Sequence, residues 1–66
     1  MTFAKALREK REEKELTQLA VANLLGITWR QYINYERGHI PPYKRLQQLN
    51  KIFKYDFSEV LFKKYG

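Results

Sequence analysis

A short run of side chains has the types and spacing needed to read the edges of DNA bases. At about 100° per residue, Arg30, Ile33 and Asn34 share one face of a helix, and Trp29 lies at the edge of that face. Arginine can donate to O6 and N7 of guanine, and asparagine can pair with N6 and N7 of adenine. Ile33 or Trp29 could contact a thymine methyl group. These residue types favour recognition of base pairs in a major groove.

Each of these residues also has an interpretation that involves no nucleic acid. Arg30 and Arg37 could form an ordinary solvated helix face. Trp29 could be a half-buried anchor of the core, and an exposed Ile33 could be a contact between subunits. The segment that precedes them favours the base-reading interpretation.

That segment predicts two helices joined by a very short turn within residues 17–37. The first helix starts at Thr17 and stops at Gly26, and the second begins at Thr28 with the capping-box pattern T-W-R-Q. Helices joined so closely cross at a steep angle, which requires a small residue such as Ala22 where they meet. The arrangement leaves the start and outer face of the second helix protruding, as in a helix that enters a major groove.

The 66 residues are predicted to form one all-α domain, because apolar residues recur at intervals of three and four and nowhere alternate as a strand requires. Besides the two helices above, we expect a helix from Thr2 to Lys14, one that opens at Pro42, and a short one that starts from Asp56 with a capping box to Glu59. The side chains expected to face inward are Phe3, Ala6, Leu7, Val21, Ala22, Leu25, Thr28, Tyr32, Tyr35, Tyr43, Leu46, Leu49, Ile52 and Phe53.

Positive charge gathers in the middle and later part of the chain. The net charge is +6, and from Thr28 to Lys54 six basic residues face a single acid, Glu36. This asymmetry suggests a polyanionic partner, either nucleic acid or an anionic membrane surface. A solvated surface that keeps the protein soluble explains the charge equally well.

Other classes of protein are disfavoured by what the sequence lacks. Without cysteine there is no disulfide, thiolate zinc site or thiol nucleophile, and His39 alone cannot form a histidine metal cluster. There is no glycine-rich phosphate loop, so we expect no enzyme activity, no metal and no cofactor. The first residues lack the pattern of a signal peptide. The apolar helix faces are all expected to be buried in one core, which leaves none for a membrane surface. We therefore expect no membrane attachment and a cytoplasmic protein, associated with the nucleoid if it binds DNA.

A spaced set of short motifs runs from Leu7 to Leu61. It consists of LREKREEK, LTQ, Ala22, Gly26, Ile27, Thr28, YERG, the proline turn, Leu46, Leu49, Ile52, Phe53, Phe57, Val60 and Leu61. No single member is specific, but together they resemble the Cro/cI-type (Xre-like) helix-turn-helix family of phage and bacterial repressors. The resemblance implies a compact five-helix domain, like that of the lambda repressor, which spans residues 1–66 and binds operator DNA as a dimer.

The resemblance also implies roles for individual residues. It places base reading on Trp29, Arg30 and Asn34. Contacts with DNA phosphates are implied for Gln18, Arg37, His39, Lys44 and Arg45. Arg11 and Glu36 match a pair that ties the first helix to the third, although they could also be two independent surface charges.

Several residues depart from the family's pattern. Glu15 stands where a glycine is usual, which predicts an altered or strained turn after the first helix. Leu19 and Leu24 replace polar residues on the outer side of the second helix, and Asn50 replaces a small residue. Trp29 is an unusual residue for base reading, so the resemblance specifies no target sequence.

Two functions from different classes remain. The first is a sequence-specific regulator of transcription, a repressor that binds an inverted repeat in double-stranded DNA as a homodimer. The second is a protein-interaction module, such as an antitoxin or antirepressor. It is motivated by surplus apolar side chains at Leu19, Leu24, Phe62 and Tyr65, which could instead form a homodimer seam through the last helix. RNA is a weaker variant, because the aromatic residues fall at core spacing.

Overall fold

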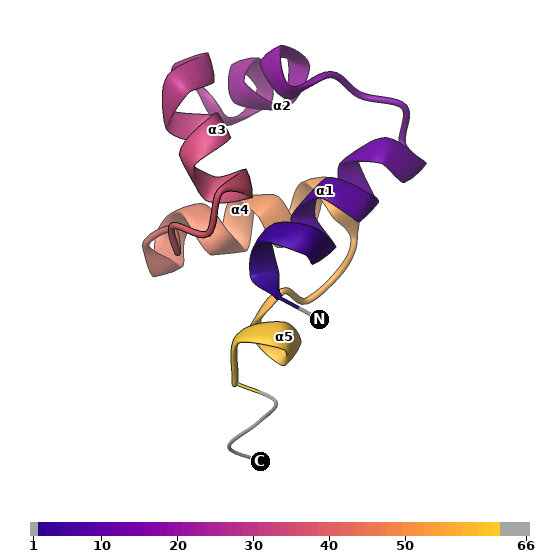
Figure 1. The fold of residues 1–66 in the computed structure, drawn as a ribbon, viewed down its shortest axis with the longest axis vertical. Helices are drawn as coiled ribbons and strands as arrows, with labels where there is room; N and C mark the ends of the chain where they lie inside the picture. Colours follow the sequence, from indigo (N-terminus) through magenta and orange to yellow (C-terminus); the bar gives the residue numbers. More distant parts are fainter. Residues whose placement is uncertain (1, 63–66) are drawn as a thin grey trace.

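The fold is a bundle of five α-helices. The computed structural model describes residues 2–62, apart from the side chain of Phe62, and no strand occurs among these residues. The helices are α1 (Phe3–Glu13), α2 (Gln18–Leu25), α3 (Trp29–Glu36), α4 (Tyr43–Phe53) and α5 (Ser58–Phe62). Figure 1 shows α2 and α3 at one end of the molecule, α1 and α4 in the middle, and α5 at the other end. The expected all-α, five-helix fold is confirmed.

Threonines cap three of the helix starts. The Oγ1 atoms of Thr2, Thr17 and Thr28 each accept a hydrogen bond from the backbone N–H three residues later, at 3.2, 3.0 and 3.1 Å. At α3 the capping box is complete, because the Gln31 side-chain oxygen accepts the Thr28 backbone N–H at 3.0 Å. Thr28 is an exposed cap, so the expectation that it faces the core is wrong.

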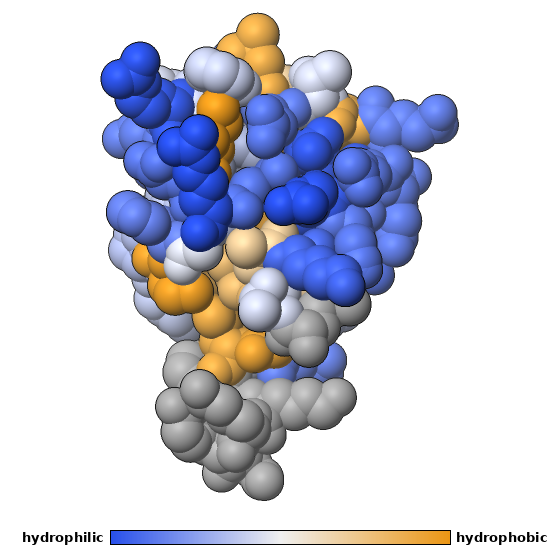
Figure 2. Space-filling model, in the orientation of Figure 1, coloured by the Kyte–Doolittle hydropathy of each residue, from blue (hydrophilic) through white to orange (hydrophobic). Residues whose placement is uncertain are grey.

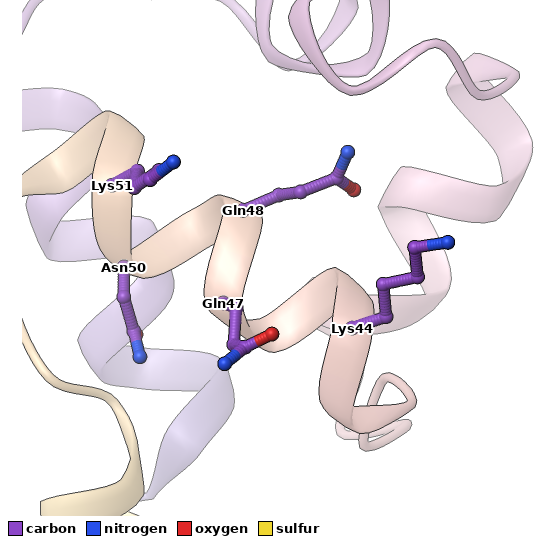
Figure 3. A pocket seen from close by; sticks show the side chains of 5 residues that line it. All are labelled: Lys44, Gln47, Gln48, Asn50 and Lys51. Atoms are coloured by element: carbon purple, nitrogen blue, oxygen red, sulfur yellow. The ribbon is translucent and has the colours of Figure 1, made fainter.

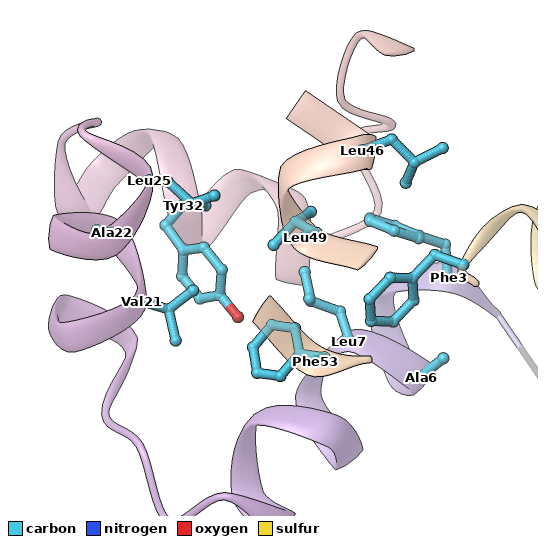
Figure 4. Close-up of a cluster of buried hydrophobic side chains, with 11 residues drawn as sticks. Phe3, Ala6, Leu7, Val21, Ala22, Leu25, Tyr32, Leu46, Leu49 and Phe53 are labelled. Carbon is cyan, nitrogen blue, oxygen red and sulfur yellow. The ribbon is translucent and has the colours of Figure 1, made fainter. Parts of the chain in front are cut away.

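One cluster of buried apolar side chains holds the helices together (Figure 4). Its members are Phe3, Ala6, Leu7, Val21, Ala22, Leu25, Tyr32, Leu46, Leu49, Phe53 and Phe57. Phe57 lies in the turn before α5 and packs edge-on against the rings of Phe3 and Tyr55, with centroid distances of 5.6 and 5.0 Å. Tyr43, which was expected to face inward, is 75% exposed. It is the first residue of α4, and the first residue of this helix in the buried cluster is Leu46, almost one turn later.

The connection from α4 to α5 is shaped by Asn50 and Asp56. The Asn50 Oδ1 atom accepts the backbone N–H of Phe57 at 2.9 Å, while Asp56 Oδ1 accepts the backbone N–H of Ser58 at 3.0 Å. The last helix therefore starts after Asp56, but the expected capping box to Glu59 does not form, since the Glu59 side chain makes no hydrogen bond to any residue in the described range. Asn50 instead supplies a side-chain hydrogen bond that holds this turn, by accepting the backbone N–H of Phe57.

Apolar surface remains on part of the molecule. Figure 2 shows hydrophilic residues over most of the face that carries α1, and an apolar strip that leads toward α5. Leu19 and Leu24 are 54% and 61% exposed, as their outer positions on α2 predict. The side chains of Phe62 and Tyr65 lie outside the described residues. None of the helices found in residues 2–62 is long and apolar enough to cross a membrane.

Two residues other than glycine adopt left-handed backbone conformations at the ends of helices. Glu15 follows α1 with φ of 55°, and Lys54 follows α4 with φ of 51°. In both turns a backbone N–H closes onto the carbonyl oxygen five residues earlier, as from Leu16 to Arg11 at 3.2 Å. A side chain makes this conformation costly by about 1–2 kcal/mol. The strained turn expected at Glu15 is confirmed.

We expect Glu15→Gly to stabilise the protein. Glycine removes the left-handed strain of about 1–2 kcal/mol. Its greater conformational freedom stabilises the unfolded chain and cancels about 0.4–1 kcal/mol of that gain. The net increase in the free energy of unfolding should be about 0.5–1 kcal/mol, measured by urea denaturation at neutral pH. Glu15→Gln is the control, because it removes the same charge and keeps the Cβ atom. Equal stability of the two variants would contradict the assignment of strain to this residue.

Candidate nucleic-acid interface

The turn between α2 and α3 positions the surface that the sequence singles out. Gly26 has φ of +72°, and with it in this left-handed conformation the N–H of Ile27 reaches the carbonyl oxygen of Ala22 at 3.0 Å. Ala22 is completely buried, so the two helices approach closely at that point. Only three residues lie between Leu25 and Trp29, and the first two residues of α3, Trp29 and Arg30, are exposed.

The outer face of α3 forms a shallow hollow, which we call the α3 hollow. It has a volume of about 330 Å³ and is lined by Trp29, Arg30, Ile33, Asn34 and Arg37. The structure thus brings the four predicted base-reading residues together, with Arg37 beside them. Trp29 is 50% exposed and belongs to this hollow and not to the buried cluster, which removes its interpretation as a core anchor.

The acid nearest to this hollow in the sequence is turned inward. Glu36 is buried, and its carboxylate receives hydrogen bonds from Arg11 Nε at 2.6 Å and from Arg11 Nη2 at 3.3 Å. Gln18 Nε2 donates to it at 3.1 Å and the Tyr32 hydroxyl at 2.6 Å. Arg11 also donates to the carbonyl oxygen of Leu16 in the turn after α1, at 2.9 Å. The structure therefore joins Arg11 and Glu36, and this network connects α1, α2 and α3.

The pKa values in this network follow from burial and hydrogen bonding. Burial by itself raises the pKa of Glu36, but hydrogen bonds from Arg11, Tyr32 and Gln18 outweigh it and bring the pKa below its ordinary value of 4.5. Burial, and then the hydrogen bond to Glu36, raise the pKa of Tyr32. Tyr32 thus remains a hydrogen-bond donor and Glu36 remains ionised at neutral pH.

Because the Glu36 carboxylate is paired with Arg11 in the interior, it does not offset the positive charge of the α3 hollow. Within residues 2–62 the ion pairs are Lys10 with Glu13 and Arg11 with Glu36, so neither Arg30 nor Arg37 is paired with a described acid. Two free guanidinium groups on one helix face suit an anionic or guanine-rich surface.

The predicted phosphate-contacting residues have different environments. Arg37 and His39 are exposed after α3, and Lys44 is exposed in the first turn of α4. Gln18 is half-buried, because its amide is held by Glu36. Arg45 is half-buried. Its Nη1 atom donates to the carbonyl oxygen of Leu25 at 2.9 Å, so it satisfies a backbone group at the end of α2.

A second hollow of about 450 Å³ lies along α4 (Figure 3). It is lined by Lys44, Gln47, Gln48, Asn50 and Lys51, and Figure 3 shows Lys44, Gln48 and Lys51 extending from one side of the helix. Of these residues, only Lys44 was among the predicted site residues. For Gln47, Gln48 and Lys51 the signal is their spacing, since positions 44, 47, 48 and 51 fall on one helical face. The spacing of four between Tyr32 and Glu36 likewise indicates their contact.

Comparison with known proteins agrees with this geometry. A family model described as a helix-turn-helix domain matches residues 4–66, which include α2, the turn at Gly26 and α3. Searches of the curated proteins and of the solved structures find no significant match. Within residues 2–62, no three histidine, cysteine, aspartate or glutamate side chains are placed to hold a metal ion.

We expect Arg11→Met to destabilise the protein strongly. The variant leaves Glu36 buried without its cation, and breaking a buried ion pair from one side costs about 3–5 kcal/mol. Urea denaturation at pH 7 measures this loss. Arg8→Met, at an exposed position on the same helix, is the matched control and should change the free energy of unfolding by less than about 0.5 kcal/mol. A loss in Arg11→Met as small as that of the control would refute a central role for the pair.

The lowered pKa of Glu36 predicts the sign of a pH dependence. The unfolded chain takes up a proton at a higher pH than the folded chain, so ionised Glu36 contributes stability above its ordinary pKa of 4.5. That contribution is lost as the pH falls through the lower, folded-state pKa. The stability advantage of the wild type over Glu36→Gln should therefore be complete at pH 6 and shrink below about pH 4.5. Urea midpoints from pH 7 to pH 2.5 measure it, with the exposed Glu12→Gln as control. A constant difference across this range would contradict the assignment.

Proposed function

Because this chain belongs to the helix-turn-helix domain family, we propose that it is a sequence-specific regulator of transcription that binds double-stranded DNA. The observation that carries the proposal is the α3 hollow, where hydrogen-bonding and cationic side chains gather on the helix that follows the turn. In helix-turn-helix proteins the second helix lies in the major groove, and residues near its N-terminus contact base edges.

In this proposal α3 reads the bases. Arg30 and Asn34 lie one turn apart on the exposed side of α3 and can donate to guanine and pair with adenine, respectively. A good bidentate contact contributes about 1–3 kcal/mol of discrimination against the wrong base. Trp29 and Ile33 supply apolar contacts beside them.

Contacts with the phosphate backbone would orient the domain on the duplex. Arg37, His39 and Lys44 are exposed after α3, and Lys51 and Gln48 extend this surface along α4. Gln18 has a second amide hydrogen besides the one given to Glu36, and it lies at the first residue of α2, where backbone N–H groups attract anions. Arg45 supports this surface indirectly, by joining α4 to the end of α2.

Repression by a homodimer is the finer part of the proposal. Two copies would bind half-sites about 10 bp apart, or a multiple of that distance, and block a promoter. The second copy would pack on the surface near α5, where the apolar side chains of Ile40, Val60 and Leu61 line a hollow of about 500 Å³ that Arg37 also lines. The protein-interaction alternative is favoured by the exposed Leu19 and Leu24 on α2, which lie outside this hollow.

Selection from a random pool of duplex DNA at about 0.15 M salt tests the proposal, because non-specific binding is then only about 10⁻⁴–10⁻⁶ M. We expect an enriched inverted repeat. Enrichment of a single half-site would contradict the dimer, and no enrichment would favour the protein-interaction alternative.

Two variants separate base reading from phosphate binding. Arg30→Ala should lose about 1–3 kcal/mol on the selected site and relax the preference at one base pair, whereas Lys44→Ala should weaken selected and random DNA equally. Lys44→Ala should also reduce the slope of log affinity against log salt by about one per subunit. Lys5→Ala on α1 is the control for loss of a surface charge. If Arg30→Ala changed neither affinity nor preference, α3 would not be the reading helix.

A further inference from the structure

We propose that the α3 hollow recognises the C5 methyl group of a pyrimidine base that lies beside a guanine. This inference rests on the proposed function and specifies what the reading helix recognises. It assigns Trp29 and Ile33 as specificity-determining residues, which a regulator that reads only hydrogen bonds would not need.

The walls of the hollow are apolar where a methyl group would lie. Trp29 and Ile33 are four residues apart, so their side chains are neighbours on one face of α3, and both line the hollow. Trp29 remains 50% exposed, and neither residue belongs to the buried cluster or to the apolar side chains packed against it. Their apolar surface is therefore available to a partner at the outer face of α3.

The major groove offers one kind of apolar group to such a surface. Guanine, adenine and cytosine present hydrogen-bond donors and acceptors there but no methyl group, whereas thymine adds its C5 methyl group. 5-Methylcytosine carries a methyl group at the same ring position. An apolar pair on a helix that lies in this groove is thus best matched by a methylated pyrimidine.

The rim of the hollow determines the neighbouring base. Arg30, the base-reading arginine, follows Trp29 directly and lines the same hollow, so it borders the apolar walls. Because arginine prefers guanine O6 and N7, the methyl contact should lie beside a guanine contact.

A second copy of the chain is a poorer occupant of this hollow. A two-fold interface centred here would bring Arg30 of both copies together in addition to Arg37, and within residues 2–62 Arg30 has no acidic partner to offset that repulsion. The positive rim therefore favours DNA over self-association at this surface.

The test replaces the thymines of the selected site one at a time with deoxyuridine, which lacks only the methyl group. At one thymine in each half-site, the substitution should weaken binding about fourfold, as expected for one buried methyl-sized group. At the same position, 5-methylcytosine should bind about fourfold more tightly than cytosine. Fluorescence anisotropy with labelled duplexes measures these ratios.

Protein variants assign the effect to the hollow. With Trp29→Ala, the affinities for thymine and deoxyuridine at that position should become nearly equal, and Ile33→Ala should reduce the fourfold ratio. Leu24→Ala removes an exposed apolar side chain from α2, outside the hollow, and should keep the ratio. Circular dichroism verifies that each variant is folded.

The possible failures are distinguishable. If the wild type bound thymine and deoxyuridine equally at every position of an enriched site, the methyl inference would be wrong and the proposed function would stand. If the ratio persisted in Trp29→Ala and Ile33→Ala, methyl recognition would lie elsewhere and the assignment of the hollow would fail. If no site were enriched, the inference and the proposed function would fall together.

Discussion

The buried carboxylate of Glu36 is the interaction on which the arrangement of the first three helices depends. A buried anion is costly unless its hydrogen bonds are satisfied, and here it receives four, from Arg11, Gln18 and Tyr32. Helices of eight residues, such as α2 and α3, are too short to be stable alone in water. Movement of either helix relative to α1 would break bonds to the buried charge, so one side chain fixes the orientation of all three.

This internal pairing also determines which charges reach solvent. Glu36 is the single acid between Thr28 and Lys54, and its inward position leaves the basic residues of that segment without a competing carboxylate. Arg37, the next residue along the chain, is exposed. The core and the surface are therefore linked, since the residue that stabilises the helix-turn-helix unit also keeps its outer face electropositive.

Much of the fold can be predicted from the sequence, because helix starts and ends have local signals. Thr17, Gly26 and Thr28 mark the limits of α2 and α3 through capping geometry that involves only nearby residues. Contacts between distant segments are harder to predict. The sequence gives no local sign that Arg45 reaches Leu25, or that Asn50 holds the N–H of Phe57. The inward assignment of Tyr43 failed because periodicity reveals a helix face but not where the core ends along it.

The hydrogen bond from Arg45 to the carbonyl oxygen of Leu25 affects the conformational entropy that the domain would lose on binding DNA. It joins α4 to the end of α2, directly before the turn that presents α3, so it restrains the surfaces proposed to contact bases and phosphates relative to each other. A rigid unit loses little conformational entropy when it docks, and more of its contact energy is retained as affinity. Its calorimetric profile should resemble that of a preformed interface, without the large unfavourable entropy that accompanies folding upon binding.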